Sequence, residues 1–155
     1  MGNLRFLLDE NLLYEAHAGV NEKGREDYSA GRLVLAIADK CHKIALDNEL
    51  RKRYQSKLKE LESVRGQAAV NVSKVLNLIM RNSGKVYVPL SRTTHLSGDV
   101  PDDDRPLVEL AIDARALFIT TDDRLISRLG KLSILTKHRL EVLRPEDAVG
   151  RASAD

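Results

Sequence analysis

Acidic residues follow two apolar segments of the chain and open a third. The run 4–8 leads directly into Asp9, the run 116–119 leads through two threonines into Asp122, and a cluster of three aspartates occupies 102–104. In an open parallel sheet, ligands bind beyond the carboxyl ends of the strands, so carboxylates delivered there by distant segments are expected to share one site. Crowded carboxylates repel one another unless they are protonated, paired or joined by a divalent cation. The spacing therefore predicts a metal site.

The elements that must position these acids alternate along the chain. Apolar runs predict strands over 4–8, 42–46, 86–88, 116–119 and 140–143. Helical periodicity predicts helices over 12–18, 32–39, 48–62, 64–79, about 103–115 and 123–137, the last interrupted at Gly130. Strands that alternate with helices indicate an α/β fold, a three-layer α/β/α sandwich around a mostly parallel central sheet. We expect a single domain over 1–149 and a flexible C-terminal tail over 150–155.

Composition is typical of a globular protein and leaves the partners open. The 155 residues include 25 Lys plus Arg against 23 Asp plus Glu, with 43% hydrophobic residues. Basic residues are concentrated over 40–59, where they could face a phosphate backbone or form a solvated helix face. The single cysteine, Cys41, excludes an internal disulfide and fits a reducing compartment. Without a signal-peptide pattern or a membrane-length apolar run, the expected location is the cytoplasm.

Three segments of the chain resemble the motifs of PIN domains. Leu7–Leu13 is similar to the family's opening, a strand followed by aspartate, one residue and a small polar residue. Asp104–Ala111 resembles its acidic helix start, and Phe118–Leu125 is similar to its strand-Thr-x-Asp-x-x-Leu element. The resemblance extends from Leu4 to about Pro145, and the three motifs occur in the family's order.

The resemblance implies a metal-dependent ribonuclease that hydrolyses phosphodiesters with Mg²⁺ or Mn²⁺. Asp9, Asp104 and Asp122 would then bind the metal, with Asn11 and Thr120 orienting those carboxylates. Mg²⁺ prefers oxygen ligands and binds through a few carboxylates plus substrate phosphate. The implied partner is RNA, single-stranded or structured. Many small PIN proteins are toxins, so an antitoxin protein and a homodimer are also expected.

The chain departs from the PIN pattern in its middle. The family usually carries a Glu-Tyr pair in the helix after the second strand, whereas Arg53 precedes Tyr54 here. Asp47 or Glu49 could supply the missing acid, and Asp47 is favoured because it ends the second predicted strand. Its alternative role is that of a helix N-cap without catalytic function.

Several neighbouring residues complete the candidate set. Asp103 could act as a supporting ligand of the metal site, and Asp123 is expected to cap the helix that follows Asp122. Four arginines could grip phosphates beside the acids: Arg53, Arg92, Arg105 and Arg124.

Other classes of site fit the sequence less well. A dinucleotide or P-loop site needs glycines after the first strand, and residues 9–11 contain none. A dehalogenase-like phosphatase needs a second aspartate where Asn11 stands. The remaining alternative is a PIN-like module that binds RNA or protein without catalysis.

The sequence itself also favours a homodimer. The apolar helix faces over 33–37 and 64–79 could exceed what one small core can cover, and two-fold dimers are common.

Overall fold

A five-stranded, all-parallel sheet forms the centre of the protein. The computed structural model describes residues 3–64 and 71–154. The strands are β1 (Arg5–Leu8), β2 (Lys43–Ala45), β3 (Val86–Tyr87), β4 (Leu117–Ile119) and β5 (Val142–Leu143), in the order β3-β2-β1-β4-β5. Phe6 lies opposite Ile44 on one side of β1, and Leu8 lies opposite Ile119 on the other. The fold is therefore the predicted α/β/α sandwich, with a fully parallel sheet.

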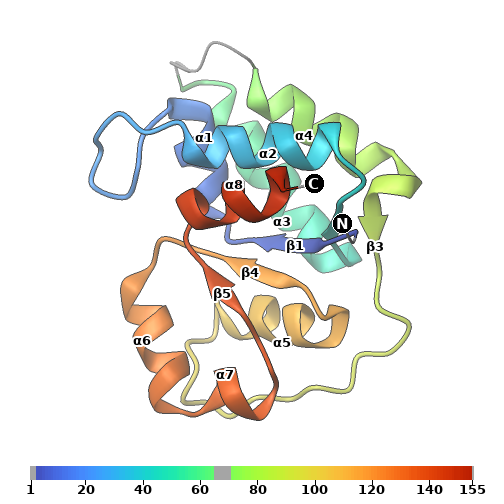
Figure 1. Ribbon diagram of the computed structural model, residues 1–155, viewed down its shortest axis with the longest axis vertical. Helices are drawn as coiled ribbons and strands as arrows, with labels where there is room; N and C mark the ends of the chain where they lie inside the picture. Colours follow the sequence, from blue (N-terminus) through green and yellow to red (C-terminus); the bar gives the residue numbers. More distant parts are fainter. Residues whose placement is uncertain (1–2, 65–70, 155) are drawn as a thin grey trace.

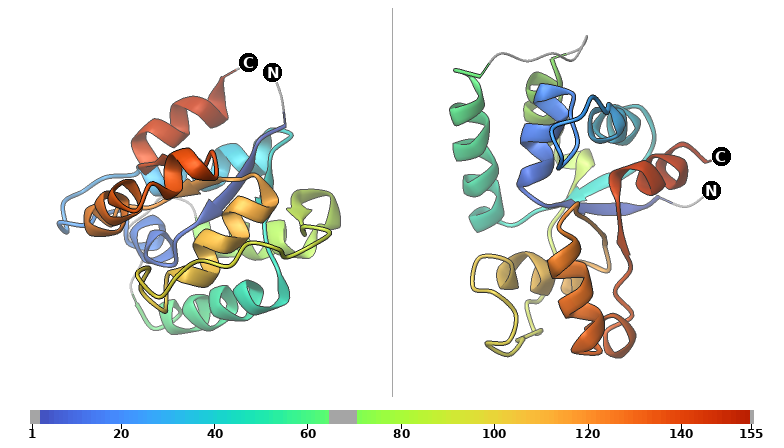
Figure 2. Two further views of the ribbon diagram at one scale, coloured as in Figure 1. Left: turned by 90° about the horizontal axis from the view of Figure 1, so that it is seen from below. Right: turned by 90° about the vertical axis from the view of Figure 1, so that its left-hand side faces the viewer.

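Helices cover both faces of the sheet (Figures 1 and 2). One face carries α1 (Asn11–Ala18), α2 (Ser29–Asp39), α3 (Asn48–Leu61), α4 (Val72–Arg81) and α8 (Pro145–Ser153). The other carries α5 (Arg105–Ala114), α6 (Asp123–Lys131) and α7 (Ile134–Lys137), and the short 3-10 turn η1 (Ser83–Lys85) precedes β3. The side chains of Phe6, Leu7 and Leu8 are buried, as expected for the central strand of a sheet covered on both faces.

Several element boundaries differ from those predicted. The helix expected over 64–79 is α4, which begins at Val72; residues 65–70 of that prediction lie outside the described part of the chain. The break expected at Gly130 occurs instead at Leu132–Ser133, between α6 and α7. Ser133 has a left-handed backbone (φ 60°), which an α-helix cannot continue.

The flexible tail predicted over 150–155 is wrong for residues 150–153, because α8 continues to Ser153, and residue 155 lies outside the described part of the chain. Pro145 fits the first turn of α8, while Glu146 and Asp147 complement the positive end of the helix dipole. The side chain of Ala152 is fully buried, and its carbonyl lies 2.7 Å from the His42 Nε2 atom. Residues 150–153 are thus part of the packed domain.

Candidate functional site

Asp9 lies immediately beyond the carboxyl end of β1 and is buried. The Thr120 hydroxyl, from the segment after β4, donates to its Oδ2 atom at 2.7 Å, and the backbone N–H of Asn11 also contacts its carboxylate. Burial raises the pKa of Asp9, and the negative charge of Asp122 raises it further, although the two hydrogen bonds act in the opposite direction. Thr120 therefore holds this carboxylate through its side chain, while Asn11 contacts it through its backbone.

Asp122 follows β4 and caps the next helix. Its side chain accepts a hydrogen bond from the Leu125 N–H at 3.1 Å, and its own N–H donates to the Thr120 hydroxyl at 3.1 Å. The expectation that Asp123 caps this helix was wrong: Asp123 is the first helical residue, is exposed, and pairs with Arg144 at 2.8 Å. Asp122 is fixed by its capping bond on one side and by Thr120 on the other.

Asp104 stands at the N-cap position of α5 but makes no capping hydrogen bond. Burial raises the pKa of its carboxyl to about 6, with further contributions from the charges of Asp9 and Asp122. Within the described residues, no donor or cation is hydrogen-bonded to or paired with this carboxylate. The alternative role of a simple helix cap does not account for it.

The three predicted metal ligands therefore act on one another electrostatically. They come from the ends of β1 and β4 and from the start of α5, and Asp9 and Asp122 are 113 positions apart in the chain. The negative charges of Asp9 and Asp122 raise the pKa of Asp104, and the charge of Asp122 also raises the pKa of Asp9, so the three carboxylates lie close enough to interact. This convergence is what the parallel sheet predicts, because its strands end at one edge.

The donor chemistry of this site fits Mg²⁺ or Mn²⁺, which prefer carboxylate oxygens. Across residues 3–64 and 71–154, however, no three His, Cys, Asp or Glu side chains form a group that could hold a metal ion as they stand. Two of the acids are drawn toward protein donors, Asp9 to Thr120 and Asp122 to the Leu125 N–H. Like charges also keep them apart.

Arg53 places a positive charge beside the acids. Its guanidinium pairs with Glu10 and donates to the backbone carbonyl of Asp103 at 3.0 Å, and its charge lowers the pKa of Asp104. Asp103 itself is exposed. The neighbouring Tyr54 is fully buried, and its hydroxyl donates to the carbonyl of Leu8, one residue before Asp9. Arg53 and Tyr54 therefore connect α3 to the site, one by charge and one by a hydrogen bond.

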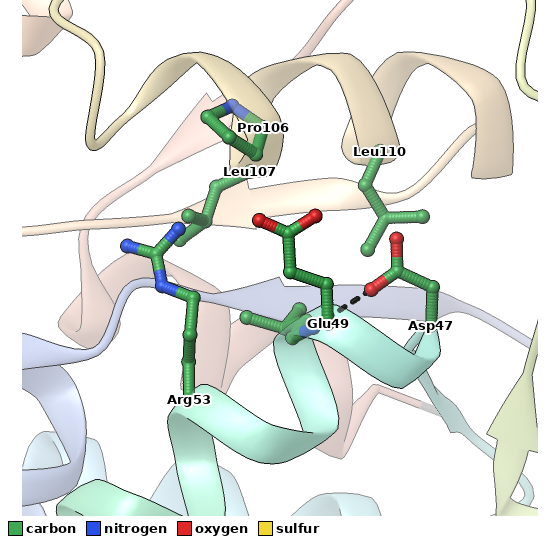
Figure 3. A pocket seen from close by; sticks show the side chains of 7 residues that line it. Asp47, Glu49, Arg53, Pro106, Leu107 and Leu110 are labelled. Carbon is green, nitrogen blue, oxygen red and sulfur yellow. Dashed lines mark hydrogen bonds between the residues drawn. The ribbon is translucent and has the colours of Figure 1, made fainter.

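Asp47 and Glu49 line a small pocket between α3 and α5, together with Arg53 (Figure 3). Asp47 caps α3 by accepting from the Leu50 N–H at 2.8 Å, and its other oxygen pairs with Arg92. Arg92 also pairs with Asp113 at 3.1 Å. Asp47 is thus an N-cap held in an ion-pair network. Its two carboxylate oxygens are therefore occupied by Leu50 and Arg92.

The four predicted arginines differ in the hydrogen bonds and ion pairs that their side chains make. Arg105 donates to the Val100 carbonyl and to Asp102, so it holds the loop before α5. Arg92 is occupied by its two carboxylates. Within the described residues, Arg124 alone among the four makes no side-chain hydrogen bond or ion pair. Its guanidinium is the one available to a phosphate without breaking a contact.

Glu15 is a fourth acid that the sequence analysis missed. It is buried on α1, one turn after Asn11, and accepts a hydrogen bond from the Thr121 hydroxyl at 3.0 Å. Burial raises the pKa of Glu15 to about 7, and the charge of Asp9 contributes to the shift. The signal was available: Glu15 lies four positions after Asn11 and hence on the same helix face, among residues predicted to be apolar.

A cavity of about 580 Å³ opens beside Asp122. Its lining includes Asn11, Tyr14, Glu15 and Lys57, so it joins α1 and α3 to the segment after β4. The aromatic ring of Tyr14 is partly exposed there. The volume is within the usual range of small-ligand sites, and its walls offer an amide, a cation and an aromatic face.

Comparison with known proteins adds no assignment. No family model matches the chain, and no curated protein matches its sequence.

Proposed function

We propose that this protein is a metal-dependent endoribonuclease that hydrolyses phosphodiester bonds with Mg²⁺ or Mn²⁺. The observation that carries the proposal is the Asp104 carboxylate, which stands at a helix start without capping it. The negative charges of Asp9 and Asp122 disfavour its ionised form. Carboxylates held in this way cost folding free energy, and a divalent cation would relieve that cost. The PIN-like motifs of the sequence support the same activity.

The chain's own residues would prepare the reaction. Asp9, Asp104 and Asp122 would hold the metal, and Thr120 would keep Asp9 oriented through its 2.7 Å hydrogen bond. A bound divalent ion would make hydroxide available near neutral pH and stabilise charge on the attacking and leaving oxygens. Glu15, with its pKa raised to about 7, is suited to exchange a proton with water near neutral pH.

The substrate would lie in the cavity beside Asp122. Lys57, in the lining of the cavity, would contact phosphates, as would the unpaired Arg124 two positions after Asp122, and Tyr14 offers a face on which a base can stack. Stacking on an aromatic ring requires an unpaired base, which favours single-stranded RNA or the loops of structured RNA. An antitoxin protein, a homodimer and a cytoplasmic location remain parts of this proposal, by resemblance to small PIN proteins.

A second candidate, a PIN-like module that binds RNA or protein without catalysis, is favoured by one observation. Arg53 occupies the position where the family usually has an acid, and Asp47 is held as an N-cap by Leu50 and paired with Arg92. The site then contains one acid fewer than the family pattern. Such a module would keep the cavity and its cations but would not cleave RNA.

The test compares Asp122→Asn with Asp123→Asn. Asparagine caps helices as well as aspartate does, so Asp122→Asn should keep α6 intact and, without metal, match or exceed the parent's thermal stability. With Mg²⁺ or Mn²⁺ it should gain less stability than the parent. Cleavage of single-stranded RNA should fall at least about a hundredfold.

Asp123→Asn is the matched control. Asp123 is exposed and its partner Arg144 also contacts Glu22 and Glu146, so the loss of this pair should change little. Metal-dependent cleavage should therefore remain close to the parental level. If the parent cuts no RNA with either metal but still binds it, the non-catalytic candidate replaces the nuclease.

A further inference from the structure

A second cavity, of about 480 Å³, lies at the edge of the sheet opposite the acids. Its lining comes from the end of α5, the first residues of β4 and the connection between α7 and β5 (Figure 1). Because all five strands are parallel, the amino end of β4 lies away from Thr120 and Asp122, which follow its carboxyl end. The cavity is therefore separate from the proposed nuclease site.

Basic side chains predominate among the charged residues that line this cavity. Arg115, His138 and Arg139 line it, and the one acidic residue in the lining, Glu141, is paired with Arg151 at 2.5 Å. Within the described residues, neither Arg115 nor Arg139 makes a side-chain hydrogen bond or ion pair. Two guanidinium groups thus border a hollow without a counter-charge of their own.

The backbone at both arginines supports a role for their side chains. Arg115 (φ 53°) and Arg139 (φ 52°) have left-handed conformations, and they are two of the three non-glycine residues with positive φ in the described ranges. Arg115 caps the end of α5, where glycine is the residue usually found. Glycine adopts this conformation at less cost than any L-residue. Residues in costly conformations cluster at ligand sites, where the side chain has a function.

We propose that this cavity binds a small phosphorylated ligand of nucleotide size. Guanidinium groups form paired hydrogen bonds to phosphate oxygens, and His138 can add a further polar contact. Ile112 and Leu140 supply apolar surface for the part of the ligand beyond the phosphate. The volume exceeds what a single phosphate ion would fill and suits a ligand of a few hundred Å³.

The experiment titrates AMP, adenosine and inorganic phosphate into the Asp122→Asn variant in EDTA, followed by NMR of the backbone amides. This background removes metal-dependent binding at the acidic site. AMP should bind with a dissociation constant of about 1 mM or less, at least about tenfold more tightly than adenosine or phosphate. The perturbed amides should lie within 111–117 and 138–141.

Arg115→Gly and Arg139→Gly then separate binding from folding. Each should weaken AMP binding at least about fivefold, and because glycine favours positive φ, each should melt no lower than the parent. Arg124→Gln, which removes an unpaired arginine at the other edge, should leave the affinity within about twofold.

Three results would overturn the proposal. These are the absence of saturable AMP binding up to about 10 mM, amide shifts confined to Asn11 and Thr121, or unchanged affinity in both glycine variants. The nuclease assay does not depend on any of them, so this proposal and the nuclease proposal fail separately.

Discussion

Burial of Glu15 makes the stability of the protein depend on pH. The pKa of its carboxyl is about 7 in the folded protein, against an ordinary value of 4.5. Between these values the unfolded chain has released the proton and the folded chain retains it, so the free energy of unfolding falls as pH rises. We expect Glu15→Gln to remove a loss of roughly 2 kcal/mol between about pH 5 and pH 8. Urea unfolding of parent and variant at both pH values measures it.

One result would contradict the prediction for Glu15. If parent and variant lose the same stability over this range, the Glu15 carboxyl is ionised in the folded protein and cannot exchange a proton near neutral pH. Glu62, which is exposed just after α3, provides the control: Glu62→Gln should leave the pH dependence of stability unchanged in sign and nearly unchanged in size.

Asp104→Asn tests whether the acids repel one another. The pKa of Asp104 is raised to about 6, so at pH 8 the folded protein holds a charge that burial and its neighbours disfavour. Without metal, the variant should be more stable than the parent by about 1 kcal/mol at pH 8, and the difference should shrink as the pH falls below about 6. Asp102→Asn, at an exposed position, should show no such gain. A variant less stable than the parent at pH 8 would mean that Asp104 has a favourable partner.

Residue types at strand ends were enough to predict that Asp9 and Asp122 lie at the same edge of the sheet. Asp9 and Asp122 follow apolar strands, and the parallel sheet brings them together. The partners of each carboxylate were harder to predict, because they depend on segments distant in the chain. Asp47 is an example: its role as N-cap was foreseeable, but its pairing with Arg92 depends on a loop 45 positions away.

At the scale of elements, Tyr54 connects α3 to the end of β1. Its hydroxyl is buried and donates to the Leu8 carbonyl, next to Asp9. Tyr54→Phe leaves that carbonyl without this donor, so we expect a loss of about 1 to 2 kcal/mol in the free energy of unfolding. RNA cleavage should fall as well, because Asp9 loses a support of its backbone. Denaturant unfolding and the cleavage assay measure the two effects; an unchanged stability would show that water replaces the hydroxyl.

The end of α8 offers a second test at this scale. Ala152 is fully buried against the rest of the domain, whereas its neighbour Ser153 is exposed. Ala152→Asp would bury an unpaired charge and should cost at least about 3 kcal/mol, while Ser153→Asp should change stability by less than about 0.5 kcal/mol. Thermal melts of the two variants distinguish them. Equal melting temperatures would restore the flexible tail that the sequence suggested.

The number and type of elements followed from periodicity, but their ends did not. Predicted strands such as 42–46 and 140–143 are longer than β2 and β5, because apolar residues continue beyond the paired part of each strand. The tail was misjudged because 150–155 is rich in small residues and looks polar. Alanines such as Ala148 and Ala152 pack closely against α2 and carry little hydrophobic signal.

At the scale of the whole molecule, the predicted homodimer needs a different surface. Most of the described apolar residues over 33–37 and 64–79 that suggested it, such as Leu33, Ile37 and Leu76, are buried within the chain, whereas Leu78 is exposed. Val88 and Leu90, after β3, are exposed instead, and Leu90 is 102% exposed. We expect light scattering at micromolar concentration to give the mass of a dimer and Leu90→Asp to give that of a monomer. A monomeric parent would contradict the dimer.

Over the described residues, no helix is long and apolar enough to cross a membrane.

The strand order determines when, during synthesis, the groups around Asp9 can come together. The first strand to be made, β1, lies at the centre of the sheet, and Asp9 obtains its Thr120 contact across 111 positions. At translation rates of roughly 5 to 20 residues per second, these partners are made about 6 to 20 seconds apart. A nascent chain that ends before β4 holds one unpaired edge of β1 and an incomplete set of acids. The proposed nuclease would stay inactive on the ribosome until β4 and Asp122 had emerged, and its refolding should be slow for its size.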